Sequence, residues 1–244
     1  MKIPVKITPD RIRDSVVQVF FQADAPFEPL IGICYSILNQ HGWRYAARPV
    51  QSKAQAGIIL EVQPLPQHFF IKENIKIQFD PNSSVIFNCI GSYVGWKSYS
   101  NIIFSVLRLL YSTQHFKNFT RVGIRYISEF ANIDILDKIK ININLKGVAG
   151  TIQNFSYRIA LLENGLSKTI NIANKLPVSA AISDKKEEVQ FVSLMDIDVV
   201  DLNLSASDIE VLFGHIERLH LEEKKVFFGI LEEHFLQTLN PEYA

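Results

Sequence analysis

The hydrophobic pattern at the start of the chain changes from a strand-like to a helix-like spacing. Residues Ser15 to Phe21 are rich in β-branched and aromatic side chains, which is typical of a short strand. From Phe27 to Gln40, apolar residues recur at every third or fourth position, and a glycine follows at Gly42. This spacing predicts an amphipathic helix that buries one face and ends near that glycine.

Three further segments of the first half have the composition of strands. They are Ala56–Val62, Ile75–Phe79 and Ser84–Ile90. The second alternates apolar and polar residues, and the turn-forming run Asp80 to Ser83 separates it from the third. We therefore expect the last two segments to form an antiparallel hairpin.

A second helix and a long strand are predicted next. Ser98 or Ser100 can cap a helix that runs to about Ser112 with a broad apolar face. The segment Thr120–Phe130 then alternates in the manner of a strand. Helix and strand have matching apolar faces, so we expect them to share one core.

The second half of the chain contains four more predicted strands and two predicted helices. The strands are Ile139–Leu145, Ile152–Leu162, Lys168–Ala173 and Val189–Val200. Asn164-Gly165 predicts a hairpin turn between two of them. One helical region opens near Ser205, and a second helix is predicted from about His220 to a point before Pro241.

The order of these elements predicts an α+β fold. Several strands precede each helix, rather than alternating with helices one by one, which favours a mainly antiparallel sheet. We expect two halves, residues 1–131 and 132–244, each with amphipathic helices packed on a sheet face. One continuous domain is the alternative, because a chain of this length fits either arrangement.

Charge and composition narrow the classes of partner. The chain has 244 residues, of which 48% are hydrophobic and 20% charged, as in globular proteins. Lys plus Arg and Asp plus Glu each number 25, so dedicated binding of duplex nucleic acid is not expected. The N-terminal segment is nevertheless basic, with Lys2 and Arg11, and the C-terminal region is acidic, with Glu222 and Glu232. This segregation favours docking to another protein.

The sequence also bears on location. Prolines and charges interrupt the first residues, and no apolar run reaches the roughly 18 residues that a membrane span needs. The two cysteines, Cys34 and Cys89, show neither metal-binding nor redox spacing. We therefore expect a cytoplasmic protein with two buried thiols and no contact with a membrane.

Motifs for catalysis and metal binding are missing. The six histidines show no metal-ligand spacing. Gly91 to Gly95 lies where a phosphate loop would sit but lacks the lysine of known loops, so a turn is the favoured interpretation. Nucleophile motifs such as Gly-x-Ser-x-Gly do not occur. The sequence thus predicts no catalytic residue, metal or cofactor, and it favours a protein that is not an enzyme without deciding the question.

One polar group of residues is a candidate site for a ligand or partner. It comprises Arg121, Arg125 and Tyr126 on the long strand, with Trp96 and Tyr99 before it. Arg121 and Arg125 share a strand face, where two guanidinium forks can grip a carboxylate or phosphate while the aromatic rings stack. The alternative is that each arginine pairs with an internal acid, such as Glu129 or Asp134.

Three segments carry a resemblance to a known family. They are Tyr93-Val-Gly-Trp96, Arg121-Val-Gly-Ile-Arg-Tyr-Ile127, and Leu219-His220 at the start of a terminal helix that contains Phe235. The arrangement resembles a sporadically distributed bacterial family of about this length, known by a serial number and without an assigned activity. The resemblance implies a bacterial cytoplasmic protein encoded among mobile or defence genes, and it transfers no catalytic residue. Asp14-Ser15 departs from the family's usual opening, which has Pro and Glu before the first strand.

The sequence supports two functional hypotheses. The first is a non-catalytic interaction or regulatory protein, a component of a bacterial defence or toxin–antitoxin-like system, whose partner is another protein encoded nearby. The second is a sensor that binds a nucleotide or other anionic small molecule through Arg121 and Arg125 with Trp96 or Tyr126. The missing catalytic motifs, the zero net charge and the segregated charge favour the first.

Overall fold

The computed structural model describes residues 2–48, 67–142, 150, 152–177 and 190–243, which form nine strands and four helices. The strands are β1 (Ile12–Ala23), β2 (Arg44–Arg48), β3 (Gln67–Lys72), β4 (Ile75–Asp80), β5 (Ser84–Cys89), β6 (Phe116–Ala131), β7 (Phe155–Glu163), β8 (Leu166–Pro177) and β9 (Phe191–Asp201). The helices are α1 (Phe27–Gln40), α2 (Trp96–Ser112), α3 (Ile209–Ile230) and α4 (Glu233–Thr238).

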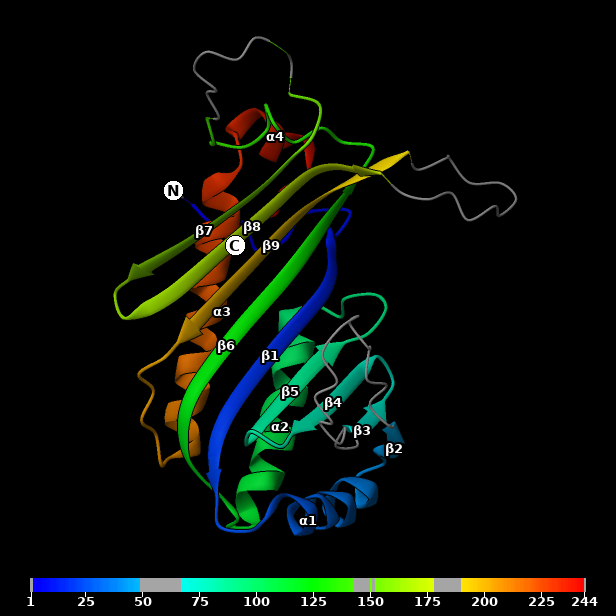
Figure 1. Cartoon of the computed structure of the whole chain (residues 1–244), viewed down its shortest axis with the longest axis vertical. Helices are drawn as coiled ribbons and strands as arrows, with labels where there is room; N and C mark the ends of the chain where they lie inside the picture. The colour runs from blue at the N-terminus through cyan, green and yellow to red at the C-terminus, as the bar shows by residue number, and fades with distance from the viewer. Residues whose placement is uncertain (1, 49–66, 143–149, 151, 178–189, 244) are drawn as a thin grey trace, which may run out of the picture. The chain divides into compact units, whose positions relative to one another are not determined.

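The nine strands belong to one sheet in the order β2-β3-β4-β5-β1-β6-β9-β8-β7 (Figure 1). The pairs β2–β3, β3–β4, β4–β5, β7–β8 and β8–β9 are all antiparallel. β2 and β7 stand at the two ends of this order and are therefore edge strands. The predicted α+β class with a mainly antiparallel sheet is confirmed.

Contacts divide the chain into two compact units, each built from segments that are not contiguous. Unit 1 contains Met1–Ser15, Gly123–Leu202 and Gly214–Ala244, whereas unit 2 contains Val16–Val122 and Asn203–Phe213. β1 and β6 each contribute residues to both units. A division of the fold into halves at residue 131 stays a prediction.

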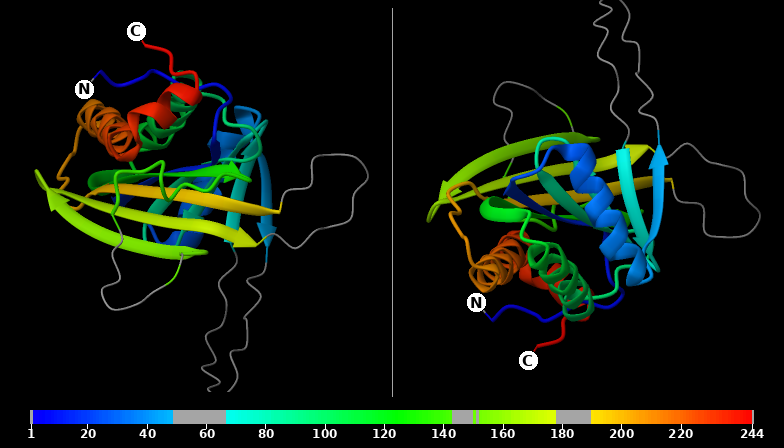
Figure 2. Two further views of the ribbon diagram at one scale, coloured as in Figure 1. Left: turned by 90° about the horizontal axis from the view of Figure 1, so that it is seen from above. Right: turned by 90° about the horizontal axis from the view of Figure 1, so that it is seen from below.

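In unit 1, α3 lies against one face of β8 and β9, and no described helix covers the other face (Figures 1 and 2). We name these the inner face and the open face. Alternation along each strand decides which residues lie where: on β9, Met195 and Ile197 are buried on the inner face, while Leu194 and Asp196 are half-buried on the open face.

The N- and C-terminal segments of unit 1 are also packed. The backbone N–H of Val5 donates to the carbonyl of Glu242 at 2.6 Å, and the ring centroids of Phe130 and Phe235 lie 5.8 Å apart. Phe235 is on α4 and is buried. The C-terminal helical region is thus an integral part of unit 1, as its apolar residues predict.

In unit 2, the β3–β4–β5 ladder buries an aromatic layer. Phe70, Phe79 and Phe87 are almost fully buried. Tyr99 on α2 is also fully buried, and its hydroxyl donates to the carbonyl of Phe87 at 2.7 Å. This bond satisfies the polar end of a large ring, which is the usual condition for burying tyrosine.

Several predicted elements are confirmed. α1 has the predicted bounds, and the β4–β5 hairpin turns at Asp80 to Ser83 as expected. β6, β8 and β9 contain most of the three predicted strands, and β7 begins at Phe155 rather than Ile152. The predicted strand Ala56–Val62 lies outside the described residues. Cys34 and Cys89 are both buried thiols.

Other predictions are wrong at element boundaries. α2 begins at Trp96, with Gly95 in its N-cap position, so neither Ser98 nor Ser100 caps it. Gly95 has φ of +80°, a conformation that glycine adopts without steric cost. The strands β2 and β3 were not predicted, because their periodic signals are weak. β2 has only five residues, two of which are alanine, and β3 begins directly after Pro66.

The predicted break before His220 is wrong as well. α3 continues without a break from Ile209 to Ile230. The His220 ring packs against Tyr126, and its Nδ1 lies 3.3 Å from the Tyr126 hydroxyl. Of the predicted strand Ile139–Leu145, Ile139 forms only an isolated bridge with Leu231, and residues 143–145 lie outside the described residues. Among the helices that are described, none is long and apolar enough to cross a membrane.

Candidate interaction surface

Arg125, one of the two arginines of the predicted site, is already paired. It projects from the open face of unit 1 and makes a two-pronged contact with Asp196, with Nε–Oδ1 at 2.7 Å and Nη2–Oδ2 at 2.8 Å. The hydrogen bond to Asp196 raises the pKa of Arg125 above its usual value. Asp196 therefore occupies the Nε–Nη2 edge of the guanidinium, and an anion could use that edge only by displacing this carboxylate.

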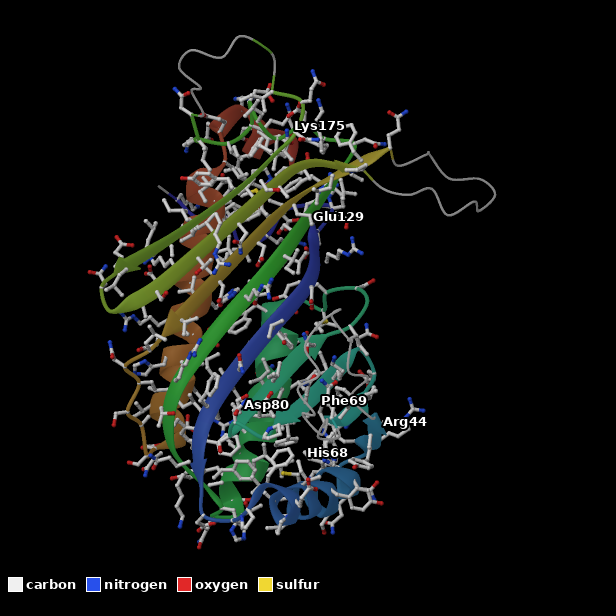
Figure 3. All side chains as sticks on the ribbon, viewed as in Figure 1. Arg44, His68, Phe69, Asp80, Glu129 and Lys175 are labelled. Carbon is white, nitrogen blue, oxygen red and sulfur yellow. The ribbon has the colours of Figure 1, made fainter. Side chains whose placement is uncertain are left out.

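Glu129 and Asp134, the acids predicted as alternative partners of the two arginines, pair with other residues. Glu129 pairs with Arg13. Asp134 pairs with Lys175, whose Nζ lies 2.7 Å from Oδ2. Figure 3 labels Glu129 and Lys175 near the end of the sheet where β6 and β8 finish. The expectation of an internal ion pair thus holds for Arg125, but with an acid on β9.

The remaining predicted residues have separate environments. In unit 2, the guanidinium of Arg121 lies 4.9 Å from the ring centroid of Phe20, and the ring of Trp96 lies 6.3 Å from that of Tyr99. In unit 1, Tyr126 is buried on the inner face, opposite to the face from which Arg125 projects. The five residues are thus distributed over two units, and their joint role in binding stays a prediction.

Arg125 instead belongs to a polar row that crosses the open face. Asn171 on β8 is the register partner of Asp196 and donates from Nδ2 to Oδ2 at 3.0 Å. Arg158 on β7 is in turn the register partner of Asn171. The row therefore reads Arg125, Asp196, Asn171, Arg158, from β6 to the edge of the sheet.

Arg158 is the uncompensated member of this row. Its side chain is exposed, and no hydrogen bond or ion pair joins it to another described residue. It lines a shallow depression of about 280 Å³ together with Asn171, Leu194 and Asp196. Because Arg125 neutralises Asp196, the depression carries one free positive charge at its outer end.

The edge strand β7 is apolar and accessible beside that charge. Leu161 and Leu162 are 43% and 77% exposed, and neither proline nor lysine interrupts the run from Ile159 to Leu162. Natural edge strands usually carry such residues to block pairing with other chains. The run was predicted as a strand, but its edge position could not be read from the sequence.

On the inner face, an ionic cluster around Lys168 joins β7 and β8 to α3. Lys168 on β8 is 5% exposed, and its Nζ lies 2.7 Å from Glu163 and 2.9 Å from Glu222. Burial opposes the charge of Lys168, yet hydrogen bonds to both carboxylates raise its pKa above the usual value. Glu163 is thereby occupied on the inner side, so Arg158 supplies the free charge of the strand.

Unit 2 offers two other polar sites, neither of which has an evident chemistry. His68, labelled in Figure 3, is 7% exposed, with its Nδ1 2.8 Å from the hydroxyl of Tyr45 and its Nε2 3.8 Å from Glu28. The ring of Phe27 on α1 packs edge-on against the imidazole at 5.7 Å. We assign His68 and its neighbours a packing role between α1 and the β2–β3 pair.

The second is a groove of about 400 Å³ beside α2. Trp43, Ile102 and Leu109 supply apolar walls, while Lys72 and Glu73 bring opposite charges to its rim. The ammonium of Lys72 also donates to a backbone carbonyl at 3.0 Å. The groove has no net charge that would select an anion, in contrast to the row that ends at Arg158.

The described residues provide no group of three or more His, Cys, Asp or Glu side chains suited to a metal ion. Cys34 is buried, and burial raises the pKa of its thiol to about 12, which makes it a poor nucleophile. No protein-family model matches the chain, and no curated protein sequence matches it significantly. The resemblance to a bacterial family thus stays a prediction.

Proposed function

We propose that this chain is a non-catalytic interaction or regulatory protein that binds another protein by adding a strand to the outer edge of β7. The observation that carries the proposal is the nine-residue edge strand with exposed Leu161 and Leu162. Strand addition draws its affinity from backbone hydrogen bonds and its specificity from alternate side chains. β7 offers both, because its outer side pairs with no described strand.

The hairpin geometry identifies the backbone groups that are available. Glu163 and Leu166 flank the two-residue turn Asn164-Gly165 and are register partners. In such a turn the flanking residues form a hydrogen-bonded pair, and hydrogen-bonded and non-hydrogen-bonded pairs alternate along the ladder. The N–H and C=O groups of Arg158, Ala160 and Leu162 therefore point away from β8.

A proline at Ala160 tests this mode directly. Ala160→Pro removes one outward donor and keeps the β7–β8 ladder, because the lost N–H does not pair with β8. Ala160→Val is the matched control, since it keeps the donor and favours a strand. Tagged chains should be expressed in the native host and crosslinked, and hydrogen exchange should be measured at the outward amides with and without the captured partner.

We expect the wild-type and Ala160→Val chains to capture the same partner and to gain protection at those amides. Ala160→Pro should lose the partner while it unfolds at nearly the same temperature as the wild type. Capture that tolerates Ala160→Pro, with no added protection on β7, would contradict the proposal.

The biological setting follows from the resemblance to a bacterial family. It favours a cytoplasmic component of a defence or toxin–antitoxin-like system, with the partner encoded by a neighbouring gene. Co-expression of this chain with each neighbouring gene product, followed by the Ala160→Pro comparison, tests that assignment. A β7-dependent complex with a product of an unrelated locus would contradict it.

A sensor for a nucleotide or other anionic small molecule is the second candidate. The free charge of Arg158 over a depression of about 280 Å³ favours it. A ligand at 100 times its dissociation constant stabilises a protein by about 2.7 kcal/mol, which a thermal-shift screen detects. The screen should compare nucleotides and phosphate on the wild-type chain and on Arg158→Gln, and only a shift that Arg158→Gln abolishes would favour the sensor.

A further inference from the structure

We infer that the segment recognised by β7 carries an acidic side chain opposite Arg158 and an apolar side chain four residues earlier, opposite Leu162. This inference rests on the proposed strand addition at the same edge. It goes further because it specifies the orientation, the register and the side-chain pattern of the partner.

The orientation follows from the sheet. Each of the five pairs with a described register is antiparallel, and antiparallel pairing is slightly more stable than parallel pairing. In an antiparallel complex the partner meets Leu162 first and Arg158 four residues later. Residues directly opposite one another point to the same face, so both contacts form on the open face.

Charge selects the acidic position. In the row across the open face, Arg125 is matched by Asp196, while Arg158 has no described counter-ion. A carboxylate on an added strand would lie directly beside the guanidinium, which can hold it with two hydrogen bonds. A lysine at the same place would meet a like charge and weaken binding.

Apolar exposure selects the other positions. Leu162 is 77% exposed on the open face, and Leu161 is 43% exposed on the inner face. Ile159 also lies on the inner face and is half-buried. Apolar residues opposite these three cover the exposed surface, and Ala160 leaves room for a β-branched residue between them. Read from its N-terminus, the segment is apolar, apolar, β-branched, apolar, acidic.

A second copy of this chain does not fit that pattern. Glu163 is the one carboxylate of β7, and it lies on the inner face, where it binds Lys168. Directly opposed residues share a face, so no register of a β7–β7 pair brings Glu163 opposite Arg158. Centring such a pair on Ala160 would place Leu162 opposite Arg158. The surface thus favours a different protein that offers an acidic strand.

Labelled peptides with the core Leu-Val-Thr-Val-Asp test the inference by fluorescence anisotropy on the full chain. The comparison peptides replace Asp with Asn or Lys and otherwise match. We expect the Asp peptide to bind the wild-type chain at least about tenfold more tightly than the Lys peptide, because tenfold corresponds to only about 1.4 kcal/mol. Arg158→Glu should reverse that preference, and Arg158→Gln should abolish it.

The controls separate this inference from the proposed function. If Ala160→Pro abolishes partner capture but all three peptides bind the wild-type and Arg158→Glu chains alike, or none binds, strand addition stands and the acidic pattern is wrong. If Ala160→Pro alters neither capture nor peptide binding, strand addition itself fails. Free acetate or phosphate that competes at millimolar levels and is insensitive to Ala160→Pro would assign Arg158 to a small anion and overturn the inference.

Discussion

The inner and open faces of unit 1 are built from the same strands, yet they differ in how far their charged side chains are buried. On the inner face, Lys168 is 5% exposed and enclosed by two carboxylates, whereas on the open face Arg125 is 47% exposed although its geometry with Asp196 is equally close. Buried ions depend on their partners, because water cannot replace them. Water or a ligand can replace the partner of an exposed ion. A face with such replaceable contacts is therefore suited to binding.

The largest difference should appear when an apolar side chain is truncated on each face of β9. Ile197 is buried on the inner face, so Ile197→Ala should reduce the free energy of unfolding by about 2 to 5 kcal/mol. Leu194→Ala removes a half-buried side chain from the open face and should cost clearly less. Urea unfolding measures both values, and equal losses would mean that the open face is covered.

The ionic cluster of the inner face gives the next largest effect. Lys168→Met removes the buried counter-ion of Glu222, which is 18% exposed and keeps Lys225 at 2.6 Å, and should lower the free energy of unfolding by about 1 to 3 kcal/mol. The full penalty is not expected, because Glu163 is 61% exposed and can be hydrated. A gain in stability would show that burial of Lys168 costs more than its two ion pairs return.

Titration of two groups on α3, the helix that packs on the inner face, should give a range of pH in which stability is constant. Burial raises the pKa of Glu223 to about 8, and burial together with Lys224 lowers the pKa of His220 to about 3. Glu223 binds its proton more tightly in the folded state, so its contribution is complete below the ordinary pKa of 4.5 and is lost as pH rises toward 8. His220 binds its proton less tightly when folded, so its contribution is lost as pH falls from 6.5 toward 3.

The two slopes oppose each other between pH 4.5 and 6.5, where we expect constant stability. Above this range only Glu223 contributes, and the loss should reach about 2 kcal/mol near pH 8, since one pKa unit corresponds to about 1.4 kcal/mol. Unfolding midpoints measured from pH 4 to 9 test the plateau. Glu223→Gln should remove the decline on the alkaline side, and a decline that survives this change would point to another group.

The smallest effect is expected on the open face. Arg125→Lys keeps the charge but removes the planar guanidinium, which donates one hydrogen bond to each carboxylate oxygen of Asp196. Because Arg125 is 47% exposed, solvent screens the pair, and we expect a loss of no more than about 1 kcal/mol. Thermal unfolding compared with that of Lys168→Met ranks the two faces, and a larger loss for Arg125→Lys would reverse the comparison.

Sequence patterns predicted the elements that are determined by neighbouring residues. α1 follows from apolar residues at helical spacing, and the β4–β5 hairpin follows from alternation and a turn-forming run. The continuity of α3 through His220 was not predicted, because a histidine near other polar residues resembles a helix end. Only the contact of its ring with a distant residue shows that it lies within the helix. This residue, Tyr126, is 94 residues away in the chain.

The candidate surface was only partly predictable. Arg125 was identified by its strand position, but its partner Asp196 lies 71 residues further along the chain. Arg158 was not singled out, although the apolar run after it and the Asn164-Gly165 turn were visible. The signal that could have found it is the run from Ile159 to Leu162, which has no polar residue to keep other strands away.

The sequence by itself determined the class of the fold, the alternation that gives each strand two faces, and the lack of a recognisable catalytic motif. These properties depend on neighbouring residues, whose geometry is set by the backbone period. Only the tertiary structure decided that β7 lies at the edge of the sheet and that Asp196 neutralises Arg125 and leaves Arg158 free. Strand order and ion pairing depend on which distant segments meet, and that is settled by the packing of the whole core.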